Sequence, residues 1–455
     1  MNVDFREALA TSLLAEVVCT ELPARAIGTH ESARGGLCAA LLSSNSVDFA
    51  MADEIARRYA LLSVYQADGS FDAAVFQDRV THQLYLAIRG IDIASPVDDD
   101  NDAGMDGGIV RGWLDPVESL RRCLERIHEA QAAGTLPPGA LTLTGHSLGG
   151  DLVYRAVFQH GLAASAYTFN ACGVSGFPGL SHGLHHLLSR ENHFVQNFIA
   201  ARGRPVASSW LPGLDPGMEF VTFIEDPSCR RTQGAEPGFA RHNDAIAPLV
   251  DALGVYRVLD LLAHGGQSFE QLTALLAATT RYSLETLEST LARIGRFFGI
   301  EVDGRYLNPR ARMHDLSFRL IETLEGAAGA RAGLLNLLGH GAPELARAAA
   351  ADTAEGLAVR HALMHGLPFA VTGVDYDATV NADGRYDRER FSDEYLQARA
   401  EYAQLLFVAN DADTLLLPAR VIAPNTGIGD PEMGTVRWRT WSPGPSPATT
   451  TCPAG

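Results

Sequence analysis

The chain has 455 residues, which exceeds the length that a single hydrophobic core usually stabilises. We therefore expect a domain of roughly 230 residues plus a further unit. Its 54 acidic against 36 basic residues give a net charge of −18, which disfavours nucleic acid as a partner and any general attraction to anionic membranes. No apolar run approaches the ~18 residues of a membrane-spanning helix, and residues 1–21 carry acidic side chains where a signal peptide is basic or apolar. We therefore expect a cytoplasmic chain, or one exported by a route that needs no signal peptide.

The first half of the chain alternates strands with helices. Residues 1–60 open on an amphipathic helical pattern over 1–21 and are expected to pack, as a helical segment, on the domain of residues 61–265. In that domain an apolar helical face spans 114–133, and the strand-like runs are residues 72–77, 83–89, 141–144, 164–169, 193–199 and 218–224. Strands that alternate with helices indicate a mostly parallel sheet with helices on both faces.

From about residue 245 the pattern changes to helices only. A capping box of Ser268 and Gln271 opens one helix, and an apolar stripe at helical spacing follows, made of Leu284, Leu287, Leu291 and Ile294. Further helical runs lie near 315–327, 342–364 and 392–409. We interpret the stripe as a packing face, with lipid contact as the alternative. Residues 266–415 are thus expected to form a helical region without catalytic groups, and residues 416–455 an extended, partly disordered tail.

The most specific pattern is Gly145-His146-Ser147-Leu148-Gly149, a G-x-S-x-G pentapeptide between a strand-like and a helix-compatible run. It is typical of a nucleophile elbow, a sharp turn that strains the serine backbone and needs small residues two before and two after it. Gly150 adds a second small residue for close helix packing. The sequence therefore predicts Ser147 as a catalytic nucleophile.

A serine nucleophile of this kind works with an acid and a histidine that follow it in the chain, on loops at the carboxyl edge of the sheet. Of the 15 histidines, those before Ser147 are out of order and those from His160 to His193 precede the last strand-like run. His242 follows that run and lies directly before a helix. We predict His242 as the general base.

Several of these segments resemble the class 3 lipase family of the α/β-hydrolases, in a bacterial branch. The similar segments are the strand ending in Arg89-Gly90, the elbow at 145–150, the strand Tyr167-Thr168-Phe169-Asn170, and the histidine-plus-helix unit at 242–256. The resemblance covers residues 72–262. It implies an α/β-hydrolase fold followed by the C-terminal helical region, and it indicates the reaction class far better than the substrate.

The resemblance also implies an oxyanion hole formed by the backbone N–H groups of Leu148 and of Ile91, the residue after Arg89-Gly90. Class 3 lipases commonly have Thr or Ser at the position of Ile91. The backbone donor is kept in this chain, but a side-chain donor is lost.

The catalytic acid is where the chain departs furthest from the family. The family's aspartate typically follows the strand after the elbow strand, but residues 197–204 contain no acid. We predict Asp226, 16 residues before His242, as the replacement, with Asp215 and Glu225 as alternatives.

An acidic insert at 91–104 lies where lipases place a mobile cover over the site. An EF-hand loop needs Gly at its sixth position and Glu at its twelfth, where this chain has Ala103 and Ile109. Residues 375–377 and 381–384 are incomplete in the same way. We therefore expect a solvated loop, no metal and no cofactor.

The sequence thus predicts a serine carboxylic-ester hydrolase, a lipase or phospholipase that forms an acyl-enzyme on Ser147 and contacts a lipid interface transiently. Ile91 and the missing acid leave two alternatives. One is an esterase acting on non-lipid acyl esters or polyesters. The other is a catalytically weak, hydrolase-like binding or effector module.

Overall fold

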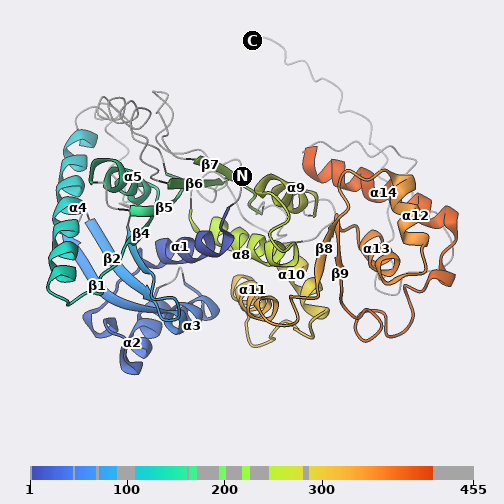
Figure 1. The fold of residues 1–455 in the computed structure, drawn as a ribbon, viewed down its shortest axis with the longest axis horizontal. Coiled ribbons are helices and arrows are strands. Elements are labelled where there is room, and N and C mark those ends of the chain that lie inside the picture. Colours follow the sequence, from blue (N-terminus) through green and yellow to red (C-terminus); the bar gives the residue numbers. More distant parts are fainter. Residues whose placement is uncertain are drawn as a thin grey trace, which may run out of the picture.

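The computed structural model describes residues 3–44, 47–67, 71–89, 108–160, 163–171, 194–200, 218–225, 245–279 and 286–412. In this part of the chain, seven strands form one sheet whose spatial order is the order of the sequence (Figure 1). The strands are β1 (Tyr59–Ala67), β2 (Phe71–Asp78), β3 (Leu84–Ile88), β4 (Leu141–His146), β5 (Ala163–Phe169), β6 (Phe194–Ala200) and β7 (Met218–Thr222). The first three are antiparallel, and β3 to β7 are parallel. The mostly parallel α/β sheet predicted from the sequence is confirmed, and β1 is an additional edge strand.

The sequential strand order decides which face of the sheet each helix covers. Right-handed crossovers that always move in the same direction along a sheet leave their helices on the same face. The crossover helices α4 (Gly108–Ala132) and α5 (Leu148–His160) accordingly pack together, with α5 over β3, β4 and β5. The opposite face is covered by α1 (Phe5–Val17), which lies across β3, β4 and β5, and by α8 (Ala247–Leu262), which packs beside α1 and on β6 (Figure 1).

Helix α1 is buried all round rather than along one stripe. Eleven of its 13 residues are buried, so the amphipathic helix expected over residues 1–21 is wrong in this respect. The reason is its position between the sheet and α8, which leaves the helix no face toward solvent. Its polar residues are bonded: Thr11 Oγ1 donates to Glu7 O at 2.6 Å, and Thr144 Oγ1 of β4 donates to Thr11 O at 3.0 Å.

The rest of the described N-terminal segment covers the edge of the sheet near β1. The 3₁₀ turn η1 (Ala24–Ala26) and helices α2 (Glu31–Leu42) and α3 (Phe49–Arg58) pack on one another, and α2 and α3 contact β1. Helix α3 passes directly into β1, because Tyr59 is both the C-cap of the helix and the first residue of the strand.

The C-terminal region is mostly helical, and its bounds are α9 (Phe269–Thr279), α10 (Leu287–Arg296), α11 (Pro309–Glu325), α12 (Ala342–Ala350), α13 (Ala354–His365), η4 (Arg388–Arg390) and α14 (Asp393–Ala412). The capping box that opens α9 is confirmed, since Gln271 N donates to Ser268 Oγ at 3.2 Å and Ser268 N to Gln271 Oε1 at 2.7 Å. The expectation of helices only is wrong. Strands β8 (Gly333–Asn336) and β9 (Phe369–Thr372) form an antiparallel pair, and four residues are too few to show a strand alternation in the sequence.

One hydrophobic core joins this region to the sheet. It contains a chain of ring contacts, two stacked and the last edge-to-face. Phe5 of α1 lies 5.5 Å from Tyr256 of α8, Tyr256 lies 5.4 Å from Phe269 of α9, and Phe269 lies 5.1 Å from Phe220 of β7. Such ring pairs stabilise the fold by about 0.5–1.5 kcal/mol each beyond the contribution of the area that they bury.

Among the described helices, none combines the length and the apolar character needed to cross a bilayer.

A buried cluster of charges ties α1, α3, α8 and α11 together. Arg310 of α11 donates two hydrogen bonds of 2.8 Å to the Glu16 carboxylate and one of 2.7 Å to Asp251. His314, one turn further along α11, lies 3.1 Å from Asp251 and 2.6 Å from Asp48, the N-cap of α3. Breaking a buried ion pair by removing one partner typically costs about 3–5 kcal/mol, so this cluster holds the C-terminal region against α1.

Burial alone lowers the pKa of the His314 imidazole, but the hydrogen bonds and charges of Asp251 and Asp48 outweigh it and raise its pKa to about 9. Against the effect of burial, His314 lowers the pKa of Asp48, and Arg310 together with His314 lowers the pKa of Asp251. His314 is therefore protonated at neutral pH in the folded chain. Because its pKa is about 6.5 when unfolded, its protonation stabilises the fold fully below pH ~6.5, and this stabilisation is lost as the pH rises through about 9.

We predict that the free energy of unfolding falls by about 2–3 kcal/mol between pH ~6.5 and ~9.5 because of His314. Denaturant titrations at the two pH values measure it. His314→Gln should be less stable at the lower pH and should lose most of the pH dependence. His340→Gln, at a partly exposed site outside the cluster, is the control and should keep it. Equal pH dependence in all three proteins would contradict the assignment.

Candidate functional site

Ser147 occupies a sharp turn between β4 and α5. Its φ is +52°, in the left-handed region that residues with a Cβ rarely adopt. The turn is held by Ser147 N, which donates to Phe169 O of β5 at 2.9 Å, and by Asp151 N, which donates to Ser147 O at 3.2 Å. A strained serine backbone costs about 1–3 kcal/mol and persists only where the surroundings impose it. This is the geometry of the nucleophile elbow predicted from G-x-S-x-G.

The glycines around Ser147 are required by close backbone approach. A Cβ on Gly145 would lie 2.5 Å from both the carbonyl carbon and oxygen of Gly149. A Cβ on Gly150 would lie 2.6 Å from the Ala171 Cβ. Neither contact can be relieved by rotating a long side chain. The elbow thus depends on glycine at both positions.

The parallel register brings the end of β3 beside the elbow. Ile88 pairs with Gly145, and His146 pairs with Phe169, so β3, β4 and β5 end close to one another. The chain after β3 is fixed by Arg89, whose N–H donates to Asp72 O at 2.9 Å and whose guanidinium donates to the Asp72 carboxylate at 2.8 Å.

Leu148 is the first residue of α5, so its backbone N–H belongs to the helix turn whose N–H groups have no acceptor inside the helix. This N–H is next to Ser147, the position that an oxyanion-hole donor occupies. The second predicted donor, Ile91, lies outside the described residues, as do the base His242 and the acid Asp226 with its alternative Asp215.

The other alternative acid, Glu225, is described, and it is buried just beyond the end of β7. Its Oε1 accepts a hydrogen bond of 3.1 Å from the backbone N–H of Leu287, the first residue of α10. Glu225 therefore binds the N-terminus of a helix, where a carboxylate is favoured by the unpaired N–H groups and the helix dipole.

Two asparagines that the sequence did not single out connect β5 and β6 beside the elbow. Asn170 has a φ of +47° directly after β5, and its Oδ1 accepts from Ala200 N at 2.9 Å. Asn197 is fully buried; its Oδ1 accepts from Thr168 Oγ1 at 3.0 Å and its Nδ2 donates to Ala171 O at 3.2 Å. The signal that could have indicated Asn170 is an asparagine directly after a strand, because asparagine tolerates the left-handed region.

Asp151 is a further residue that sequence reasoning missed. It lies in the first turn of α5, four residues after Ser147, and is 1% exposed. The amino end of a helix favours a negative charge, which fits a carboxylate at this position.

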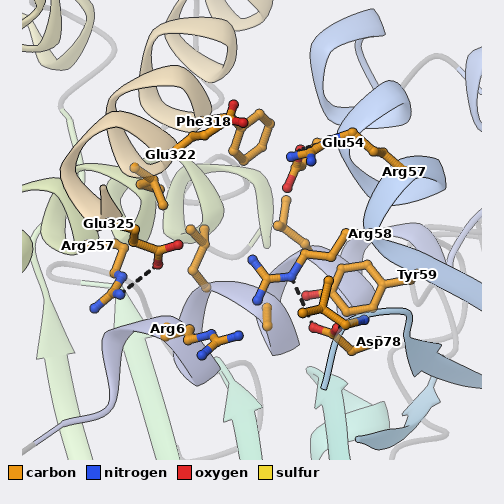
Figure 2. Close-up of a pocket in the computed structure, with 15 residues that line it drawn as sticks. Arg6, Glu54, Arg57, Arg58, Tyr59, Asp78, Arg257, Phe318, Glu322 and Glu325 are labelled. Atoms are coloured by element: carbon orange, nitrogen blue, oxygen red, sulfur yellow. Dashed lines mark hydrogen bonds and ion pairs between the residues drawn. The ribbon is translucent and has the colours of Figure 1, made fainter. Parts of the chain in front are cut away.

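A separate pocket of about 250 Å³ lies between α1, α3, α8 and α11 (Figure 2). Its lining includes Tyr59, the first residue of β1, and Asp78, the last residue of β2. Because β1 and β2 are antiparallel, both residues lie at the edge of the sheet where the parallel strands begin. Ser147 lies at the opposite edge. Figure 2 shows two ion pairs in the pocket, Arg58 with Asp78 at 3.2 Å and Arg257 with Glu325 at 2.9 Å. Ligands of such sheets bind at the carboxyl edge, so we do not assign the active site to this pocket.

No group of three His, Cys, Asp or Glu side chains that could hold a metal ion occurs within the described ranges. The acidic insert at 91–104 lies outside them. Residues 375–387 are described, and there Asp377 and Asp387 accept hydrogen bonds from Asn381 Nδ2 at 2.7 and 3.0 Å. These carboxylates therefore order their own loop.

The comparisons with known proteins add little to the site. No family model matches the chain, and no curated protein matches its sequence. Two solved structures of Lip2 lipase from Yarrowia lipolytica are similar in part. The structure at 1.7 Å resolution is 13% identical, with a TM-score of 0.30, and the match covers 50% of this chain and 81% of that one. The nonglycosylated form is 14% identical, with a TM-score of 0.31, and the match covers 50% of this chain and 82% of that one. The resemblance to class 3 lipases accordingly rests on the sequence segments that suggested it.

We predict that Gly145→Ala lowers the free energy of unfolding by about 1–3 kcal/mol or more, because the new methyl group overlaps the Gly149 backbone. Denaturant unfolding of the purified variant measures this. The matched control is Gly35→Ala in α2, where a Cβ meets nothing within 4 Å. That variant should be as stable as the original chain or slightly more stable. If Gly145→Ala behaved like the control, the close approach at the elbow would be wrong.

Proposed function

We propose that this chain is a serine carboxylic-ester hydrolase, a lipase or phospholipase that works through an acyl-enzyme on Ser147. The single observation that carries the proposal is the left-handed Ser147 at the turn from β4 to α5, with Gly145 close to the Gly149 backbone and Gly150 close to the Ala171 Cβ. A strained turn of this kind presents the serine hydroxyl above the end of the sheet and beside a helix N-terminus.

The reaction begins when Ser147 Oγ attacks the ester carbonyl carbon while His242 accepts the hydroxyl proton. The negative charge that develops on the carbonyl oxygen is stabilised by the N–H groups of Leu148 and Ile91, and one such donor is worth about 3–4 kcal/mol. The tetrahedral intermediate then collapses. The C–O bond to the leaving alcohol breaks, the alcohol takes the proton from His242, and water hydrolyses the acyl-enzyme in the same way.

The path of the chain supports His242 as the base. Strand β7 ends at the carboxyl edge and α8 begins at Ala247, so the segment that holds His242 starts from the same edge as the elbow. Because the carboxyl ends of parallel strands lie along one edge, this order suits a base that must reach Ser147.

The contacts of the neighbouring polar residues favour Asp226 as the acid that orients His242. Glu225 accepts a hydrogen bond from the N-terminus of α10. Asn197, near the family's usual acid position, is hydrogen-bonded to Thr168 and Ala171. Asp226 directly follows Glu225 in the chain. It would hold the imidazole in the correct tautomer and stabilise its cation.

Two experiments distinguish the proposed lipase or phospholipase from the two alternative functions that the sequence suggests. A fast reaction with short soluble esters but none with triacylglycerol or phospholipid would indicate an esterase of non-lipid acyl esters or polyesters. Failure of a fluorophosphonate probe to label Ser147 would indicate a catalytically weak binding module, since such probes react quickly only with activated serines.

We predict that Ser147→Ala lowers turnover of a p-nitrophenyl ester to well below about a tenth of the original value, while circular dichroism stays unchanged. His242→Ala should lose as much activity. The double variant should be scarcely worse than either single variant, because the two groups act as one unit. Retention of more than about a tenth of the turnover in Ser147→Ala, or additive losses in the double variant, would reject these roles.

We predict that Asp226→Asn lowers kcat on the order of 10³-fold, because the group that orients His242 is lost. Steady-state kinetics on the same ester measures this. Asp215→Asn is the matched control and should change kcat little. The reverse result would identify Asp215 as the acid.

A further inference from the structure

A second pocket, of about 670 Å³, lies in the C-terminal region, and five of its lining side chains are Arg or His, against one carboxylate, Glu301. We call it the basic pocket. It is bounded by α10, the turn after α10, α13 and the segment that ends at Tyr386, all outside the seven-stranded sheet. Its basic residues are Arg293, Arg296, His361, His365 and Arg385. In a chain of net charge −18, such a concentration of basic groups creates a local field that attracts anions.

The walls of the basic pocket are joined by directed hydrogen bonds. Arg293 Nη1 lies 3.0 Å from His365 Nδ1, and His365 Nε2 lies 2.6 Å from the Tyr386 hydroxyl. A guanidinium can only donate, so Nδ1 of His365 is the acceptor and its Nε2 carries the proton that is donated to Tyr386. These bonds connect α10, α13 and the segment before η4 and hold the lining groups in place without a ligand.

His361 is the most buried polar group of the basic pocket. It is 5% exposed and contacts the rings of Phe297, His365, Tyr376 and Tyr386, with no hydrogen-bond partner among the residues that the structure describes. Burial, together with the nearby charges of Arg293 and Arg296, holds the pKa of His361 well below the usual value. Because His361 lines the pocket, its imidazole N–H can donate to an oxygen acceptor that enters the pocket.

The positive charge of the basic pocket is partly neutralised by Glu301, which lines it, and by the carboxylates of the loop before η4. Arg385 pairs with Asp383 at 2.8 Å, while Asp377 and Asp387 are engaged by Asn381. Arg296, three residues after Arg293 on the same side of α10, is exposed and has no ion pair within the described ranges. Two guanidinium groups and an imidazole thus face one space.

We propose that the basic pocket binds the phosphate group of a phosphorylated ligand. Guanidinium forks donate paired hydrogen bonds to phosphate oxygens, and the negative charge of a phosphate monoester would pair with the Arg296 guanidinium beside Arg293. His361 donates the third contact. The phosphate belongs either to a soluble molecule or to a monoester lipid headgroup, and both sources present the same chemistry. The proposal is independent of ester hydrolysis, because no residue of the elbow lines the pocket.

We predict that the full chain binds inorganic phosphate in isothermal titration calorimetry, and that Arg296→Gln and His361→Asn each weaken binding at least about tenfold, or ~1.4 kcal/mol. Arg305→Gln is the matched control, since this exposed arginine is paired with Asp303 and does not line the pocket. It should bind phosphate like the original chain. Thermal unfolding of each variant confirms that the fold is kept.

A second arm distinguishes the two sources. Sedimentation with phosphatidylcholine vesicles containing about 20% phosphatidic acid tests the monoester headgroup, and the same share of phosphatidylserine tests negative charge alone. Arg296-dependent binding of phosphatidic acid but not phosphatidylserine, with weak binding of free phosphate, supports a lipid source. Arg296-dependent binding of free phosphate supports a soluble ligand.

Arginines in the last turn of a helix also stabilise it through the helix dipole. If that were the whole role of Arg296, Arg296→Gln would lower the melting temperature and leave phosphate binding unchanged, which would overturn the proposal. Absence of binding to both inorganic phosphate and phosphatidic acid would overturn it as well.

Discussion

The structure depends on one topological constraint: the strands of the sheet follow one another in space as they do in the sequence. Right-handed crossovers then leave α4 and α5 on one face, and no crossover helix of this series can cover the other. That face must be covered by segments before and after the strands, which are α1 and α8. The two ends of the α/β unit are therefore part of its core.

This constraint explains why a charged cluster lies in the interior. Helix α1 is enclosed, so Glu16 cannot reach solvent and needs a buried cation. Arg310 supplies it from α11, nearly 300 residues later in the chain, and also binds Asp251. Desolvating these groups is costly, and their mutual hydrogen bonds offset the cost only while all of them are present. Folding of the sheet and packing of the C-terminal helices are coupled for this reason.

The features predicted correctly from the sequence are those that local chemistry determines. The elbow requires small residues at fixed distances from Ser147, and the strands of the parallel sheet are short apolar runs between turns, so both are visible in a short window. Strand β1 was missed because it continues from α3 without a turn residue between Arg58 and Tyr59. The burial of α1 was missed because it depends on what packs against each side of the helix.

Long-range pairings were beyond the sequence for a similar reason. The pattern around Glu225 suggests a carboxylate at a strand end, but its partner is the backbone of Leu287, 62 residues away. Asn197 and Thr168 are adjacent only because β5 and β6 pair in one register. The basic pocket combines residues from 292 to 386, and no motif links them.

Helix α10 links the seven-stranded sheet to the basic pocket. Its first residue is held by Glu225 at the end of the sheet, and its last turn carries Arg293 and Arg296. Ten helical residues span about 15 Å. One short helix therefore connects the carboxyl end of β7 to the wall of the basic pocket. The sheet and the C-terminal region are thus joined by helix α10 as well as by one hydrophobic core.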